Sequence, residues 1–482
     1  MKPYQPLHGL PPLAGLATFE EAQRPGFSIE ECVKRLKRYH YAFKRLHEIF
    51  IARLTAEPIY ELKMAFSLHA HYCAEHAAAL RLRVGEMREP PLGLDVVPDE
   101  NLALFFDEIL GAPTTAELVG GLYTLAVPAL RRGLEAHIAL TNPLVDHPSI
   151  RLCRFALLEV REMEAYGRLA FAGSIKEAGR EPTHDTYRLS GSWSDLLAQA
   201  LRRAGGLSGD ETDPAAEPPI RRYSAQPFQY DGTPRRDERF PDPYNMGVNA
   251  EAFLYDASLP PEPKVLMMFY KRLREIDVPE MMASIITETK GKPWGYYRDM
   301  TRQLWDEARH AMMGEVGFVA SGLDWPERVM INFTWSLGLN TQLTPRERHG
   351  VLYFIEQGLM PKTGKRFEWE TAQASGSTLS TLFQDYDWAD EVLHARVGRD
   401  WYVSTFENPK EAVEWGDRCW SKVVMGWSQW RDEGLTGHRN WWPEVYGEYC
   451  AQHGLEPEPA VLAFDTSYET QRADLKVLSG SG

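Results

Sequence analysis

The hydrophobic positions of this chain recur mainly at spacings of three and four residues, which is the period of an amphipathic helix. Residues 28–57, SIEECVKRLKRYHYAFKRLHEIFIARLTAE, show the pattern well, with Lys and Arg on the opposite face. Strand signals are scarce, so we predict an all-α fold. Further helices are predicted over about 59–88, 114–140, 148–174, 262–290, 294–321, 326–360 (interrupted at Pro345), 375–403 and 408–432.

Composition separates the predicted helices into two groups. Between them, residues 176–261 hold much of the proline, in stretches such as DGTPRRDERFPDPYNMG, which is typical of irregular structure. Consecutive long helices with short connections indicate a bundle on either side. The sequence predicts an extended arm (1–25), an N-terminal helical bundle (26–175), a Pro-rich linker (176–261), a second helical bundle (262–432) and a C-terminal tail (433–482).

Length, charge and cysteine usage narrow the class of protein. The chain has 482 residues, enough for two or three domains, and a net charge of −15 without a long basic run. This balance argues against a nucleic-acid platform. Five widely spaced cysteines without a C-x-x-C motif indicate free thiols in a reducing compartment. With neither a signal-like N-terminus nor a run of 18 apolar residues, we expect a cytoplasmic location and no membrane partner.

One charged nonapeptide occurs twice in the second bundle. Residues 306–314 read DEARHAMMG and residues 390–398 read DEVLHARVG, so both fit D-E-x-x-H-A-x-x-G. On a helix, positions i and i+3 share a face, which pairs Glu307 with His310 and Glu391 with His394. A single E-x-x-H is weak and is more often a surface ion pair. Two copies with matching flanks favour a metal site.

Two metal ions held close together need carboxylates to balance their charge and one imidazole each. Four facing helices supply this set when two give a Glu and two give a Glu-x-x-His. Among the upstream candidates, Glu280 and Glu356 lie in apolar surroundings, where an unpaired carboxylate is costly. Glu275 or Glu288 is the alternative for the first position, and Glu347 for the second. The predicted ligands are Glu280, Glu307, His310, Glu356, Glu391 and His394.

The flanking residues predict an outer layer around the ligands. Metal-bound histidine usually donates its other N–H to a carboxylate, so Asp306 and Asp390 are expected to serve the histidine of the opposite helix. Arg309 is expected to hold Asp306 in turn. Small residues would let the helix backbones approach closely; they are Ala311, Gly314, Ala395 and Gly398.

The segment Asp306–His310 matches D-E-x-R-H and so resembles the signature of ferritin-like di-iron carboxylate proteins. These include the hydroxylase subunits of bacterial multicomponent monooxygenases and the small subunit of ribonucleotide reductase. The second copy resembles it less fully, because Leu393 replaces the Arg. The resemblance covers about residues 262–405. It implies a ferritin-like four-helix bundle with two iron ions, or manganese and iron, that activates O2.

The expected activity is therefore an O2-dependent oxidase or oxygenase acting on a small organic substrate. Such an enzyme needs external electrons, so a reductase or ferredoxin is the implied partner, and a homodimer is possible. Tyr353 and Trp388 each precede a predicted ligand by three residues; both a relay of electrons and simple packing stay open for them.

Two further classes of function stay open. The first is a non-catalytic helical interaction protein, and the second is a metal-handling protein. A separate metal site in the N-terminal bundle, around His69, His71, His76, Glu159 and Glu162, is a weaker possibility, because no D-E-x-x-H occurs there. The nucleotide-binding patterns G-x-x-x-x-G-K-[ST] and G-x-G-x-x-G do not occur in the chain, so nucleotide chemistry is not indicated.

Overall fold

The computed structural model describes residues 4–87, 93–177, 192–210, 219–361 and 364–468. Within these residues the chain is helical, and β-pairing amounts to one isolated bridge between Val248 and Ser467. The all-α expectation is confirmed for this part of the chain. Packing divides it into two compact units: residues 1–50 with 69–229, and residues 51–68 with 230–482.

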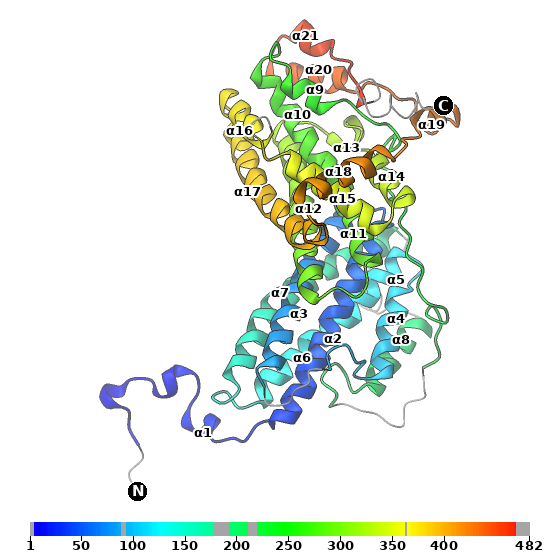
Figure 1. Ribbon diagram of the computed structural model, residues 1–482. Coiled ribbons are helices and arrows are strands. Elements are labelled where there is room, and N and C mark those ends of the chain that lie inside the picture. The colour runs from blue at the N-terminus through cyan, green and yellow to red at the C-terminus, as the bar shows by residue number, and fades with distance from the viewer. Residues whose placement is uncertain (1–3, 88–92, 178–191, 211–218, 362–363, 469–482) are drawn as a thin grey trace. The chain divides into compact units, whose positions relative to one another are not determined.

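The first unit is built on long helices (Figure 1). Asp99 and Thr114 cap two of them, because their side chains accept hydrogen bonds from backbone N–H groups of the first turn. The 176–261 segment, expected to be irregular, contains two of the helices, α8 in this unit and α9 in the next. The helices here are most of α2 (Ile29–Leu54) and of α3 (Tyr60–Gly85), then α4 (Glu100–Leu110), α5 (Thr115–Gly120), the π-helix η3 (Gly121–Ala126), α6 (Val127–Leu140), α7 (His147–Glu177) and α8 (Ser192–Arg203), after α1 (Phe19–Ala22).

The second unit carries both copies of the repeated motif, one on α12 and one on α17. Its elements are α9 (Ala250–Tyr255), α10 (Pro261–Leu273), the 3-10 turn η4 (Arg274–Ile276), α11 (Asp277–Glu288), α12 (Trp294–Ala320), α13 (Trp325–Arg328), α14 (Thr334–Gln342), α15 (Pro345–Gly358), α16 (Lys365–Ala374), α17 (Thr378–Trp401), η5 (Val403–Thr405), α18 (Pro409–Ser421), α19 (Trp427–Asp432), α20 (Trp442–His453) and α21 (Pro459–Leu462).

Three of the predicted helices are broken, those over 262–290, 326–360 and 408–432, and local chemistry explains one break. The interruption predicted at Pro345 within 326–360 is confirmed, since α15 begins there, and this segment is broken a second time between α13 and α14. Thr344 caps α15 in a reciprocal box with Glu347, and Pro345 occupies the first helical position, where a missing N–H costs nothing. The expected helix over 262–290 is interrupted by η4, a single 3-10 turn between α10 and α11.

Four helices of the second unit pack around the motif residues: α11, α12, α15 and α17. Close approach depends on two glycines. A Cβ at Gly314 would lie 2.3 Å from the backbone nitrogen of Leu273, and one at Gly398 would lie 2.3 Å from a ring carbon of Tyr353. The expected close approach of helix backbones is therefore confirmed at Gly314, whereas Gly398 makes room for the side chain of Tyr353.

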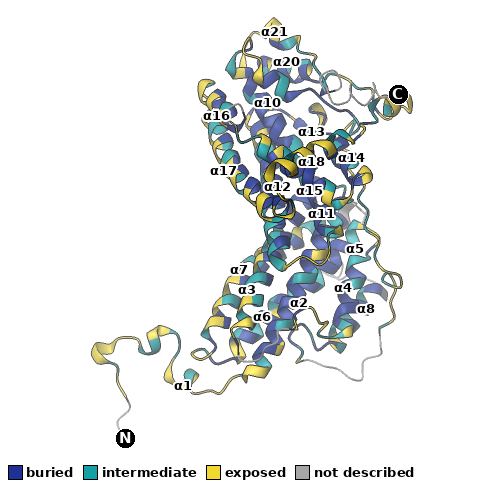
Figure 2. Cartoon of the chain, in the orientation of Figure 1, coloured by how far each residue is buried: buried dark blue, intermediate teal, exposed yellow. Residues whose placement is uncertain are grey.

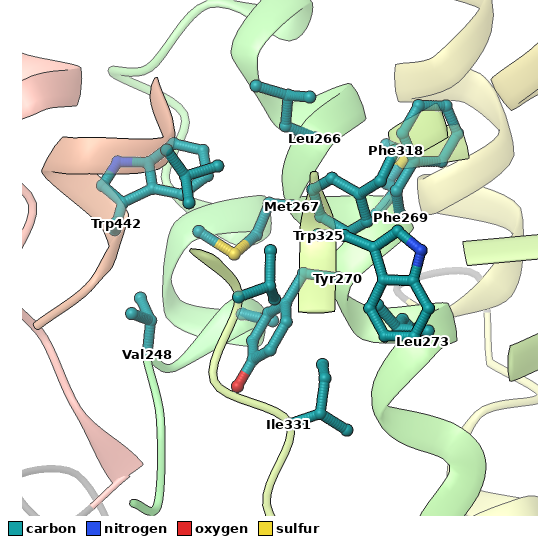
Figure 3. Packing of buried hydrophobic residues seen from close by; sticks show 14 of the residues in the cluster. Val248, Leu266, Met267, Phe269, Tyr270, Leu273, Phe318, Trp325, Ile331 and Trp442 are labelled. Carbon is teal, nitrogen blue, oxygen red and sulfur yellow. The ribbon is translucent and has the colours of Figure 1, made fainter. Parts of the chain in front are cut away.

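An aromatic-rich core lies beside this bundle (Figure 3). Phe269 and Tyr270 of α10 pack there with Trp325, and Trp442 of α20 joins them, fully buried. The segment after residue 432 thus contributes to the core of the second unit.

The buried stripe of α17 is polar, unlike that of an ordinary amphipathic helix. Its outer side is exposed (Figure 2). The inner positions recur at three- and four-residue spacing and include Ser380, Gln384, Asp387, Glu391 and His394, each at most 1% exposed. Burying such groups is costly unless they are paired. The inner face of α17 therefore marks the candidate site.

Candidate metal centre

The two E-x-x-H motifs face each other across α12 and α17. His394 directs Nδ1 toward three carboxylates: it lies 3.2 Å from Glu307 Oε1, 3.3 Å from Glu391 Oε2 and 3.9 Å from Glu356 Oε1. These four residues are buried, and their ligand atoms lie within 4.8 Å of one another. This group forms the first half of the candidate centre.

The second half gathers around His310 on α12. Its Nδ1 lies 3.4 Å from Glu275 Oε2, 3.5 Å from Glu307 Oε2 and 3.4 Å from Asp387 Oδ1. Glu391 also lies in a compact group with His310 and Asp387. Glu307 and Glu391 thus belong to groups in both halves, as carboxylates placed between two cation positions would.

Glu280 is not part of this cluster, which corrects the predicted ligand set. Its carboxylate accepts hydrogen bonds from Lys63 Nζ at 2.7 Å and Ser336 Oγ at 2.9 Å, and it pairs closely with Arg236. Both cations that compensate its burial are distant in sequence, since Lys63 comes from the 51–68 segment and Arg236 from the 176–261 segment, and no local pattern reveals these pairings.

Glu275, in the 3-10 turn before α11, faces His310 in place of Glu280. The two positions are five residues apart, which rotates their side chains well away from each other on a helix. Glu288 and Glu347 lie outside the cluster. Glu288 pairs with Arg348, and Glu347 caps α15.

Each histidine is held from behind by the aspartate of the opposite helix. Asp390 Oδ2 lies 3.1 Å from His310 Nε2, and Asp306 Oδ2 lies 3.5 Å from His394 Nε2. Arg309 contacts both aspartates, with an Nη2–Oδ2 distance of 2.7 Å to Asp390 and a closer contact to Asp306. Arg302 of the same helix also contacts both, with Nε 2.9 Å from each oxygen of Asp306 and Nη2 4.0 Å from Asp390 Oδ1, so Leu393 leaves neither aspartate without a partner.

Two buried cations beside the cluster were not anticipated. Lys365 Nζ lies 2.9 Å from both carboxylate oxygens of Asp387 and 2.9 Å from Glu391 Oε1. Arg272 Nη2 lies 2.9 Å from Glu275 Oε1, and Arg272 also pairs with Asp387. They come from α16 and α10, outside the repeated motifs. The one available signal was Asp387, which lies one helical turn before Glu391 and shares its face.

With both histidines neutral and every carboxylate ionised, negative charge exceeds positive charge in this cluster. Five carboxylates face only two permanently cationic side chains; the carboxylates are Glu275, Glu307, Glu356, Asp387 and Glu391. Burial, with Glu391 and Glu307 nearby, raises the pKa of Glu356 well above its usual range. Burial lowers the pKa values of His310 and His394, but the surrounding carboxylates outweigh this effect and raise both pKa values well above normal. The cluster therefore favours additional positive charge.

The hydrogen bonding of the cluster is incomplete. Within the part of the chain that the structure describes, four buried atoms have ionic contacts of 3.2–3.5 Å but no hydrogen bond: Glu307 Oε1, Glu275 Oε2, His310 Nδ1 and His394 Nε2. Buried polar atoms are nearly always paired, so each exception calls for an explanation. Three of these atoms belong to the groups that face one another in the cluster, as unfilled ligand positions would.

The two aromatic residues preceding the ligands differ in surroundings. Tyr353 is buried, and its ring centre lies 5.5 Å from that of Tyr402. Trp388 is partly buried and packs 6.3 Å from Trp369. Both contacts fit the packing interpretation left open from the sequence.

The histidines considered in the N-terminal bundle do not form a comparable group. His69 Nδ1 lies 2.6 Å from the hydroxyl of Tyr123, and His76 Nε2 lies 2.6 Å from Glu159. A different trio, Cys32, His137 and Asp146, gathers in the first unit. Thr141, His137 and Cys32 all contact Asp146 there, so hydrogen bonding already accounts for that carboxylate.

Comparisons with family models, with curated proteins and with solved structures found no match to this chain. Among the described residues, the helices that are long enough to cross a membrane are too polar to do so.

Proposed function

We propose that the protein is a two-metal oxidase or oxygenase of the ferritin-like di-iron carboxylate type. The observation that carries this proposal is the pairing of two Glu-x-x-His groups across α12 and α17, with Glu307 and Glu391 shared between them. Each histidine also has an aspartate behind it, the arrangement that orients metal-bound imidazole.

The residues present fit a pair of iron or manganese ions. Glu356, Glu307, Glu391 and His394 would hold one ion. Around His310 two overlapping groups offer ligands for the other, Glu275 with Glu307 and Asp387 with Glu391. Carboxylate and imidazole ligands suit these metals. The ligand atoms that lack a hydrogen bond and the excess of negative charge both support the fit. When bound, such a pair supplies the reducing equivalents and the binding position for O2.

The protein's own residues would prepare and protect this chemistry. Asp306 and Asp390 fix the imidazole rings, and Arg309 fixes the aspartates. Burial opposes ionisation of Asp306, but its contacts with His394 and Arg309 outweigh this and lower its pKa to about 2. Lys365 orients Glu391 and Asp387 through its three contacts. The burial of every ligand side chain except Glu275, which is partly exposed, keeps bulk water away from the reacting atoms. A small organic substrate and an electron-donating reductase or ferredoxin complete the proposal.

A second function has one specific observation in its favour. Lys365 and Arg272 neutralise part of the cluster without any metal, as in a structural ion-pair network. The protein would then be a non-catalytic interaction protein, and the cluster would contribute only to folding.

Metal analysis separates the two functions. Protein purified from cells supplied with iron and manganese is measured by plasma mass spectrometry, beside Glu307→Gln and Glu391→Gln. Asp385→Asn, an exposed carboxylate on the same helix, is the matched control. About two metal equivalents per chain, lost in the two cluster variants and kept in the control, support the enzyme. A folded, metal-free wild-type protein contradicts it. Oxygen consumption after reduction then distinguishes oxidation from metal storage.

A further inference from the structure

A cavity of about 540 Å³ opens at one end of the α11, α12, α15 and α17 bundle. This volume is within the range of pockets that hold small organic ligands. Its walls come from the end of α11, the beginnings of α12 and α15, and the end of α17. The lining residues are Thr289, Lys292, Tyr296, Thr344, Pro345, Arg346, His349, Trp401, Tyr402 and Thr405.

The charge of this cavity is opposite to that of the whole chain. The chain carries a net charge of −15, yet the lining includes Lys292 and Arg346 and no carboxylate. The Arg346 guanidinium lies 5.2 Å from the ring centre of Phe406 and 5.3 Å from that of Trp415. Such stacking holds a guanidinium in place. The rim is therefore suited to an anionic group.

The deeper wall is aromatic. Tyr296 and Tyr402 are 1% and 2% exposed. The ring of Trp401 stands at 87° to that of Tyr296, 5.7 Å away, and its Nε1 donates a hydrogen bond to Asp299. These contacts fix the rings before any ligand arrives. A flat apolar group would fit against them with little loss of side-chain entropy.

One buried polar atom at this wall has no partner. His349 lines the cavity and is 6% exposed, and its Nε2 is buried without a hydrogen bond within the described residues. Burial, with Lys292 nearby, lowers the pKa of His349 to about 4, so the ring is neutral at pH 7. A buried polar atom of this kind calls for a partner, which a ligand would supply.

From these observations we propose that the cavity is a binding site for an aromatic carboxylate. The carboxylate lies between Lys292 and Arg346 at the rim, the ring lies against Tyr296 and Trp401, and a polar atom of the ligand meets His349 Nε2. His349 lies two helical turns from Glu356 on α15, and Trp401 lies two helical turns from His394 on α17. Each separation is about 10 Å along the helix axis. The site is thus separate from the metal cluster and does not depend on its occupancy.

Binding of 2-naphthoate to the full chain, measured by isothermal titration calorimetry after chelator treatment, tests this inference. The uncharged analogue 2-naphthamide is the matched control ligand. Hydrogen bonds to a charged group contribute about 1.5–3 kcal/mol, so we expect about tenfold or greater weakening with the amide and with Arg346→Gln or Lys292→Gln. Arg396→Gln, an exposed cation on α17 outside the cavity, should bind as the wild type does.

Two results overturn the inference: the absence of naphthoate binding at millimolar concentration, or equal affinity for the acid and the amide. His349→Phe adds a second test, because it should change affinity for 6-hydroxy-2-naphthoate more than for 2-naphthoate. Equal effects on both ligands also contradict the assigned orientation. Because the protein is metal-free in these measurements, failure here is distinct from failure of the two-metal proposal.

Discussion

Asp390 on α17 reaches across to His310 on α12, with 3.1 Å between its Oδ2 and the imidazole Nε2. The reciprocal contact joins Asp306 to His394, and Arg309 touches both aspartates. The repeated nonapeptide thus folds into a structure in which each copy supports the histidine of the other.

Each aspartate contacts one histidine, whereas Arg309 contacts both aspartates, so we expect different effects when an aspartate or the arginine is replaced. Removing a partner of this kind typically weakens metal affinity 10- to 100-fold. Asp390→Asn should weaken one metal-binding step by about this amount. Arg309→Leu should weaken both steps, because Arg309 contacts both aspartates, with the larger loss at the His310 side, because Arg302 still holds Asp306. Chelator competition with Mn²⁺ measures the two steps. A loss confined to one step in Arg309→Leu would argue against the shared role.

We expect the loss of stability on replacing Lys365 to depend on whether metal is bound. Removing one partner of a buried ion pair costs about 3–5 kcal/mol, so Lys365→Met should lower the unfolding free energy of the metal-free protein by about that amount. Added metal ions would supply positive charge and reduce the difference from wild type. Urea unfolding with and without Mn²⁺ measures this. The exposed Lys410→Met is the control and should change stability by about 1 kcal/mol or less.

We expect a side chain at Gly314 to destabilise the protein by crowding the neighbouring backbone. Alanine at this position would place its Cβ against the backbone of α10, because the nearest atoms belong to Leu273 and Phe269. Overpacking typically costs 1–3 kcal/mol and outweighs the gain in helix propensity of about 1 kcal/mol. Gly447→Ala, in α20 with open space around it, should instead be neutral or slightly stabilising. Thermal unfolding of both variants measures this difference. A Gly314→Ala variant more stable than Gly447→Ala would contradict the prediction.

We expect the first unit to lose stability in mild acid. Burial lowers the pKa values of His47 and His69 to about 3. The unfolded chain, with a histidine pKa near 6.5, therefore binds more protons between these values, and the stability present above pH 6.5 declines as the pH falls toward 3. Each such histidine costs about 2 kcal/mol between pH 8 and pH 5.

Urea midpoints of wild type and His69→Gln across this pH range measure that decline. The variant should show a smaller decline, because one of the groups that charges on unfolding is gone. An identical pH dependence in both proteins would show that His69 does not contribute.

The sequence predicted the helical class, the two motif helices and the Glu and His that share a face on each, because helical period and i, i+3 spacing are local properties. It missed Lys365 and Arg272, since ion pairs between separate helices leave no local pattern. Glu280 was favoured because it lies among apolar residues, and it is indeed buried. Its compensating cations, Lys63 and Arg236, are distant in sequence, and the 3-10 turn that directs Glu275 inward has no strong local signal.

The central proposal is that two cations share Glu307 and Glu391. Titration of the metal-free protein with Mn²⁺, followed by electron paramagnetic resonance, tests it most directly. Shared carboxylates place the ions close together, so we expect about two equivalents bound and an exchange-coupled signal. That signal should be lost in Glu391→Gln and retained in Asp385→Asn. An isolated one-equivalent signal, or no binding by the folded protein, would contradict the two-metal centre.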